Sequence, residues 1–203
     1  MPKVSIAIPY HDTPKSAFFL ARLLKSLSEQ TFTDYEIVLV KAGEMAKTHN
    51  EAIKASKGEI IKVMQMDDYF AHPYALQRIV DGFTGDWMIT GCVHTLEDVE
   101  GTFNPHIPSW NEELLTGNNT LGGFSTLALR NHKDLPLMDE RMSWLVDCDY
   151  YWRLKDKYGL PTLLEDLNVV VDVRNDRLTH TIPDEVKQEE LALVLEKHDS
   201  RKI

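Results

Sequence analysis

Residues 50–68 read NEAIKASKGEIIKVMQMDD: a helix-like segment passes through Gly58 into a short apolar stretch and ends on Asp67 and Asp68. The apolar stretch is typical of a buried strand, and the glycine is a natural end for the preceding helix. Open α/β sheets bind their ligands at the carboxyl ends of strands, where these two acids stand. Adjacent carboxylates repel each other unless a cation lies beside them, and a divalent metal such as Mg²⁺ or Mn²⁺ would supply that charge. The alternative interpretation is a solvated acidic turn after a strand.

Strand-like and helix-like segments alternate through the first 95 residues. Strands are expected at residues 4–9, 35–40, 59–64 and 87–93, and helices at residues 15–30, 44–56 and 73–83. The first helix, for example, carries Phe19, Leu23 and Leu27 at helical spacing, as one apolar stripe. This order predicts an α/β fold: a mostly parallel mixed sheet flanked by helices, in a Rossmann-related three-layer sandwich.

The second half of the chain is less regular. Residues 97–123 are rich in Gly, Asn, Thr and Pro, and further elements are expected as short helix 110–115, strand 124–129, helix 147–158, strand 168–173 and terminal helix 185–197. The sequence has 203 residues and contains no repeat or clear linker. We therefore expect a single domain over residues 1–203, made of a first half (1–95), a second half (96–182) and a C-terminal helical tail (183–203).

The composition limits the classes of partner and compartment. The chain has 22 basic and 32 acidic residues, a net charge of −10, which disfavours bulk binding to nucleic acid because such a surface repels phosphates. Cys92 and Cys148 form no CxxC pair or disulfide framework, which favours a reducing compartment. The sequence contains neither a signal-peptide pattern nor the roughly 20 apolar residues of a membrane span. A soluble, cytoplasmic protein is expected.

An ordered set of motifs resembles the family-two glycosyltransferases with the A-type fold. Residues 4–12 (VSIAIPYHD) resemble the family's opening strand and nucleotide-contacting loop. Residues 50–61 (NEAIKASKGEII) match its N-x-(A/G)-(I/L)-x-x-A-x-G-(D/E)-(Y/I)-I segment, which leads into an acidic D-x-D motif, here 65–68 (QMDD). Residues 138–141 (MDER) and 147–154 (DCDYYWRL) resemble a later turn and the acidic start of the following helix. The resemblance spans about residues 3–180.

The resemblance implies a metal-dependent, inverting glycosyltransferase that moves one sugar from a nucleotide-diphospho-sugar to an acceptor hydroxyl. The implied donor is a UDP-sugar and the implied cofactor is Mn²⁺ or Mg²⁺, while the acceptor stays unidentified. A metal would stabilise the departing diphosphate, and a separate carboxylate would act as general base toward the hydroxyl. Residues 1–95 would then form the nucleotide-sugar half and residues 96–182 the acceptor half.

The resemblance also assigns roles to individual residues. Asp67 matches the last acid of the D-x-D motif, a metal ligand, and His180 matches a late histidine that completes the metal site in some members. Asp147 aligns with the catalytic base and Asp149 is the alternative, although an Asp at a helix start is also an ordinary cap. The donor-binding residues implied are Pro9, Tyr10, His11, Asp12, His49, Asn50, Gln65, Asp67 and Asp68.

Two other functions remain open at this point. A nucleotidyltransferase on a related sheet usually has a glycine-rich loop after the first strand, whereas residues 10–14 (YHDTP) contain no glycine. A non-catalytic member that binds a sugar nucleotide or a partner is favoured by two departures from the family pattern. Gln65 replaces the first acid of D-x-D, and residues 41–44 (KAGE) lack the expected acid that contacts uracil.

Overall fold

The computed structural model describes residues 1–96, 101–174 and 181–198. Their helices and strands, with η for 3₁₀ helices, are β1 (Val4–Pro9), α1 (Ser16–Ser28), β2 (Tyr35–Val40), α2 (Met45–Ala55), β3 (Ile60–Val63), β4 (Tyr69–Phe70), α3 (Ala75–Gly82), β5 (Trp87–Thr95), β6 (Phe103–His106), η1 (Glu112–Thr116), η2 (Phe124–Thr126), β7 (Leu127–Arg130), α4 (Val146–Tyr158), β8 (Thr162–Asp172) and α6 (Asp184–His198). No helix among these residues is long and apolar enough to cross a membrane.

The strands form one eight-stranded mixed sheet in the order β2-β1-β3-β7-β5-β8-β4, with β6 paired to β5. β1 is parallel to β2 and β3, and β5 is parallel to β8. The other described pairs, β3–β7, β4–β8, β5–β6 and β5–β7, are antiparallel. The expected α/β fold is confirmed, but the sheet is less parallel than the sequence indicates. Helical crossovers produce the parallel pairs, whereas β6 pairs with β5, and β7 with β3 and β5, in the opposite direction.

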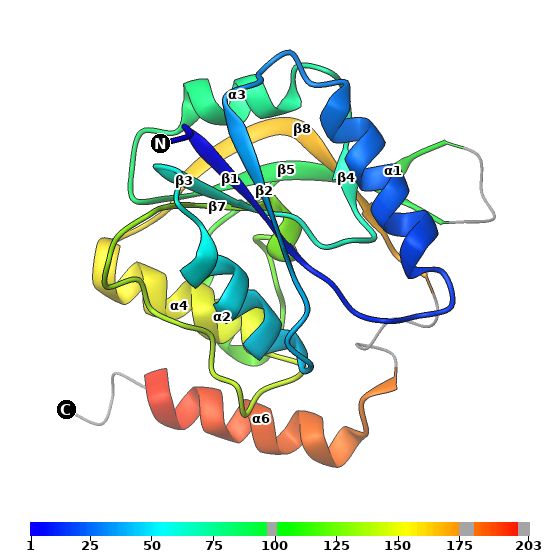
Figure 1. Cartoon of the computed structure of the whole chain (residues 1–203). Coiled ribbons are helices and arrows are strands. Elements are labelled where there is room, and N and C mark those ends of the chain that lie inside the picture. The colour runs from blue at the N-terminus through cyan, green and yellow to red at the C-terminus, as the bar shows by residue number, and fades with distance from the viewer. Residues whose placement is uncertain (97–100, 175–180, 199–203) are drawn as a thin grey trace.

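Helices cover both faces of the sheet, as the three-layer prediction requires (Figure 1). α1 and α3 lie on one face, and α2 and α4 lie on the other. The side chains of β1 alternate between the two resulting cores: Ile6 and Ile8 belong to the core under α1 and α3, and Ala7 to the core under α2 and α4. Burial on both faces of β1 explains why its sequence is apolar at every position except Ser5.

The close packing of β3 against β1 depends on Gly58. A side chain at this position would place its Cβ 2.6 Å from the amide nitrogen of Ser5, which is too close for any residue other than glycine. The amide of Gly58 also donates to the Ser5 hydroxyl, over 2.8 Å. The glycine that ends the predicted helix therefore also lets β3 approach β1, and this fixes where the Asp67–Asp68 turn emerges.

Two predicted strands begin elsewhere in the structure, and two short strands were missed. Residues 124–126 form the 3₁₀ turn η2 and the strand begins only at Leu127, while β8 begins at Thr162 rather than at residue 168. The short strands β4 and β6 were not predicted. Each of these two strands is at most four residues long, too short to show the two-residue alternation that identifies a strand in sequence.

Candidate functional site

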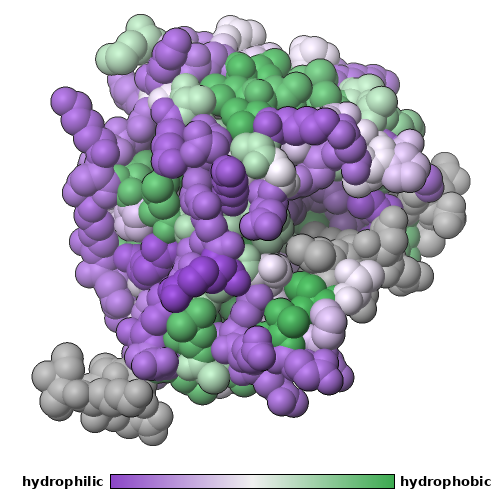
Figure 2. Space-filling model, turned by 60° about the horizontal axis from the view of Figure 1, so that its bottom comes forward, coloured by the Kyte–Doolittle hydropathy of each residue, from purple (hydrophilic) through white to green (hydrophobic). Residues whose placement is uncertain are grey.

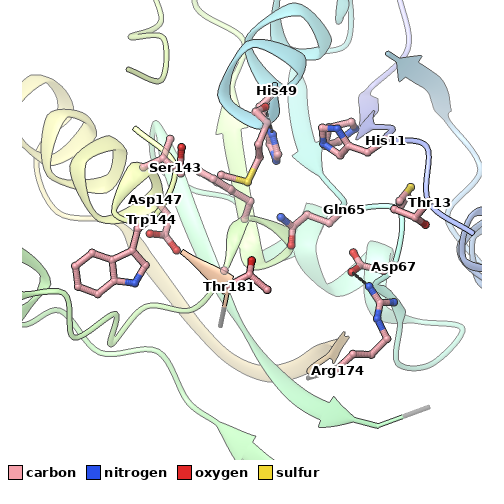
Figure 3. A pocket seen from close by; sticks show the side chains of 16 residues that line it. His11, Thr13, His49, Gln65, Asp67, Ser143, Trp144, Asp147, Arg174 and Thr181 are labelled. Carbon is pink, nitrogen blue, oxygen red and sulfur yellow. Dashed lines mark hydrogen bonds and ion pairs between the residues drawn. The ribbon is translucent and has the colours of Figure 1, made fainter. Parts of the chain in front are cut away.

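A cavity of about 470 Å³ opens where β1 and β3 end. Segments far apart in the sequence line it, through Pro9, His11, Thr13, Met45, His49, Gln65, Met66, Asp67, Gly123, Phe124, Ser143, Trp144, Val146, Asp147, Arg174 and Thr181. Asp67 and Arg174 face each other on one side of it, while Asp147 and Trp144 lie on another (Figure 3). The surrounding surface is mostly hydrophilic and is hollowed on the face shown in Figure 2.

The cavity brings together six of the residues that the sequence predicts for the site: Pro9, His11, His49, Gln65, Asp67 and Asp147. They come from the ends of β1 and β3, from α2 and from the start of α4. The site therefore lies at the carboxyl ends of parallel strands, as expected for an open α/β sheet. We refer to it below as the main cavity.

Tyr10 and Asp12, two of the predicted donor-binding residues, do not line the main cavity. The Tyr10 hydroxyl lies 2.9 Å from the Ser16 hydroxyl, and its ring packs against the core under α1 and α3. Asp12 is exposed and forms an ion pair with Lys41. The loop after β1 therefore presents Pro9, His11 and Thr13 to the cavity and turns Tyr10 and Asp12 away from it.

Asn50 and Asp68 are also absent from the cavity lining, because both are used inside the fold. The Asn50 amide group donates to the backbone oxygen of Met138 (3.0 Å) and accepts from its backbone nitrogen (2.7 Å). Asn50 thus fixes α2 to the chain that precedes α4. Asp68 is 1% exposed and accepts from the backbone amide of Asp172 over 2.9 Å. Of the paired carboxylates, only Asp67 faces the cavity.

Asp147 lies between the main cavity and a second cavity of about 260 Å³, and contributes to the lining of both. Its carboxylate accepts from the Asn119 side chain over 2.7 Å and from the Cys148 amide over 2.8 Å. Burial raises the pKa of this carboxyl above its usual range, and the two hydrogen bonds only partly oppose that shift. Asn119 is itself held, because its Oδ1 accepts from the amides of Leu121 and Gly122. The carboxylate is thus fixed in orientation and is a stronger proton acceptor than an exposed aspartate.

The structure does not use Asp147 as the N-cap of α4. The N-cap position is Leu145, which has no capping side chain. The backbone amides that precede and begin the helix, those of Ser143, Trp144 and Leu145, instead donate to the buried carboxylate of Glu190 over 2.7–2.8 Å. Because Glu190 belongs to α6, the C-terminal segment is more than an attached tail: it holds the loop that carries Trp144 into the cavity.

Asp149, the alternative base, is excluded from that role by its position. Its side chain is 0% exposed and lines neither cavity. It forms ion pairs with Arg153 (2.9 Å), Lys197 (2.6 Å) and His198 (2.9 Å), so it joins α4 to α6. Burial opposes its ionisation, but the hydrogen bonds from His198 and Lys197 outweigh burial and lower the pKa of this carboxyl. A low-pKa carboxylate inside an ion-pair cluster has no access to an acceptor.

Asp67, the expected metal ligand, is bound by a cation from the protein itself. The guanidinium of Arg174 lies 3.2 Å from the Asp67 carboxylate, and Arg22 donates to the Asp67 backbone oxygen. Within the described parts of the chain, no three His, Cys, Asp or Glu side chains come together as a metal-ligand group. The other predicted ligand, His180, lies outside the described residues. The described residues therefore do not by themselves fit a resident divalent metal, which stays a prediction of the resemblance.

His49 presents a neutral imidazole to the main cavity. Its Nδ1 lies 2.8 Å from the Met45 backbone oxygen, and because a carbonyl can only accept, Nδ1 carries the proton. Its ring is tilted against Phe124, with 4.7 Å between the ring centroids. Burial lowers the pKa of His49 to about 4, so the ring stays uncharged at neutral pH.

The His49 environment predicts a loss of stability in mild acid. In the unfolded chain His49 takes up a proton below pH 6.5, whereas the folded protein resists protonation until about pH 4. The unfolded state therefore binds more protons in this window, and the free energy of unfolding falls as the pH falls through it, by up to about 3 kcal/mol. Urea unfolding at several pH values between 6.5 and 5 gives the free energy of unfolding as a function of pH. This free energy should fall less steeply with falling pH for His49→Gln, which cannot be protonated, than for the wild type. Equal pH dependence in the two proteins would contradict a buried, neutral His49.

Sequence reasoning missed several residues that shape the site. Arg174 follows the end of β8, so the strand-end rule that found Asp67 would also have found it. Asn119 and Glu190 gave no comparable signal, since their partners Asp147 and Leu145 are 28 and 45 residues away. Trp144 lines both cavities, but it was not among the predicted site residues.

Known structures with a similar fold include several of TarS from S. aureus. Its segment 1–349 in complex with UDP superimposes with a TM-score of 0.62 and 17% identity, over 98% of this chain and 72% of that chain. The same segment with UDP-GlcNAc gives a TM-score of 0.64 and 15% identity, over 95% of this chain and 66% of that chain. A further structure of segment 1–349 matches over 60% of its length, and a longer TarS structure over 44%. This chain thus spans only part of the TarS structures.

A comparison with protein-family models finds no match, and neither does a comparison with curated protein sequences. At 15–17% identity, the likeness to TarS concerns the fold. It extends over nearly the whole of this chain and agrees with the order of motifs found in the sequence. This chain has the A-type glycosyltransferase fold.

Proposed function

We propose that this chain transfers a sugar from a nucleotide-diphospho-sugar to an acceptor hydroxyl, with inversion at the anomeric carbon. The observation that carries this proposal is the position of Asp147, a partly buried carboxylate with a raised pKa between two cavities. A donor in the main cavity and an acceptor in the second would meet beside it. The structures of TarS with UDP and with UDP-GlcNAc support the assignment of the donor class.

The proposed reaction is a single displacement. The acceptor oxygen attacks the anomeric carbon while the bond from that carbon to the diphosphate oxygen breaks, and the electron pair leaves with the nucleoside diphosphate. Asp147 takes the proton from the attacking hydroxyl, so no charge accumulates on the new glycosidic oxygen. Attack opposite the leaving group inverts the configuration. Asn119 would keep the Asp147 carboxylate aimed at the hydroxyl, through the 2.7 Å hydrogen bond.

A binding-only function is the second candidate, because Gln65 occupies the place of an acid in the family motif and lines the main cavity. A screen by thermal shift, followed by assay of donor breakdown, separates the two. A nucleotide sugar of the right class should raise the melting temperature, since a ligand that binds only the folded state stabilises it. It should also be slowly hydrolysed by excess protein. Binding without breakdown or transfer would favour the second candidate, and no response to any nucleotide sugar would contradict both.

A further inference from the structure

We propose that Arg174, rather than a divalent metal ion, neutralises the diphosphate of the donor in the main cavity. This inference rests on the proposed function, because it concerns how the same donor is held. It departs from the cofactor that the family resemblance implies. Three observations carry it: the contacts of Arg174, the orientation of the neighbouring acids, and the support given by a second arginine.

Arg174 stands where a metal on Asp67 would have to lie. Its guanidinium lines the cavity, contacts the Asp67 carboxylate at 3.2 Å and lies 3.8 Å from Asp172. A divalent ion bound to Asp67 would sit beside this fixed positive charge, and two cations at one carboxylate repel each other. Arg174 therefore competes with a metal for Asp67.

The neighbouring acids are arranged for arginines and not for a metal. Asp68 is turned into the fold, onto the Asp172 amide, and Gln65 carries no charge. A metal held by protein and diphosphate together usually takes one or two carboxylates. In the described part of the site, the one pocket-facing carboxylate from the motif is Asp67, and Arg174 already occupies it.

A second arginine, Arg22, holds the two acidic partners of Arg174 in place. It donates to Asp172 over 2.8 Å and to the backbone oxygen of Asp67, so it fixes both partners of Arg174. The guanidinium of Arg174 also stacks on the ring of Phe19, 4.0 Å from the ring centroid. A guanidinium held in this way keeps several N–H donors in one plane, which match two phosphate oxygens at once. Because the guanidinium lines the main cavity, a diphosphate bound there would meet its positive charge.

Calorimetry with UDP tests the inference, with inorganic pyrophosphate as a probe that lacks the base. Each is titrated into the wild-type protein, Arg174→Gln and Arg174→Lys, once in EDTA and once in Mn²⁺. Wild-type affinity for UDP should differ by less than about threefold between the two buffers. In EDTA, Arg174→Gln should bind UDP about 10- to 100-fold more weakly than the wild type does, which is the usual contribution of a charged hydrogen-bonding group. Mn²⁺ should partly restore its binding, because Asp67 has lost its cation.

Arg174→Lys keeps the charge but not the planar fork, so it should fall between the other two proteins in EDTA. Melting temperatures of all three proteins show whether a change in binding reflects loss of the fold. The inference is overturned if wild-type binding requires Mn²⁺, or if Arg174→Gln binds UDP in EDTA as well as the wild type does. Pyrophosphate binding without UDP binding would leave Arg174 in its role and count against uridine. If neither probe nor any other nucleoside diphosphate binds in either buffer, the proposed function itself fails.

Discussion

Replacing Asp147 with Asn should lower the turnover of sugar transfer by roughly 10²–10⁴-fold, the usual contribution of a general base. An amide cannot accept the proton of the acceptor hydroxyl, although it has nearly the same shape as the carboxylate. Donor affinity should change little, because the wild-type side chain is already committed to Asn119 and Cys148. The measurement is initial-rate kinetics at saturating donor, with donor affinity obtained separately by calorimetry.

The pH dependence of the reaction gives an independent readout of the same group. Asp147 must be ionised to act as a base, and burial raises its pKa. The rate should therefore fall on the acid side at a higher pH than an exposed aspartate would give.

Asp156→Asn is the matched control for the Asp147→Asn substitution, because Asp156 lies on the same helix, is exposed, and lines neither cavity. If Asp147→Asn keeps near-normal turnover, Asp147 is not the base.

The second large effect is on stability. Asp149→Asn should lower the free energy of unfolding by about 3 kcal/mol, because it leaves the charges of Arg153 and Lys197 without their buried partner. We expect the lower end of the usual 3–5 kcal/mol, since the side chains of Arg153 and Lys197 are 27% and 23% exposed and can be partly hydrated. Urea unfolding at neutral pH measures the effect as a shift in midpoint at constant slope.

The two aspartates are controls for each other. Asp147→Asn removes at most one good hydrogen bond and should change stability by only about 1 kcal/mol. At a temperature where both variants are folded, Asp149→Asn should retain most of its turnover. The opposite pattern, a stable but inactive Asp149→Asn beside an active Asp147→Asn, would mean that the roles of the two residues are exchanged.

Much of the main cavity could be predicted from sequence, because local patterns determine it. The apolar runs that become β1 and β3, and the helix that becomes α2, each follow from a few adjacent residues. Gly58 marks both the end of the helix and the close approach of β3 to β1. Once these strands are parallel neighbours, residues after their carboxyl ends must converge, which places His11, Gln65 and Asp67 in one cavity.

The choice between Asp147 and Asp149 could not be made from sequence. Two residues apart on a helix, they point to nearly opposite sides, since successive residues turn by about 100°. Either one would satisfy the family pattern. The packing of α6 decides between them, because Lys197 and His198 cover Asp149 and leave Asp147 at the cavity.

The sequence by itself determined the α/β class, the order of the first elements and the strand ends at which the main cavity opens, because these depend on short-range periodicity and on glycine. Only the tertiary structure decided which polar residues are available there. It buried Asp68 and Asn50 in backbone contacts, placed Arg174 on Asp67 across 107 positions of sequence, and gave the start of α4 its cap from Glu190. A carboxylate can be a ligand, a base or a structural anchor. Its partners decide among these roles, and in this fold they come from distant segments.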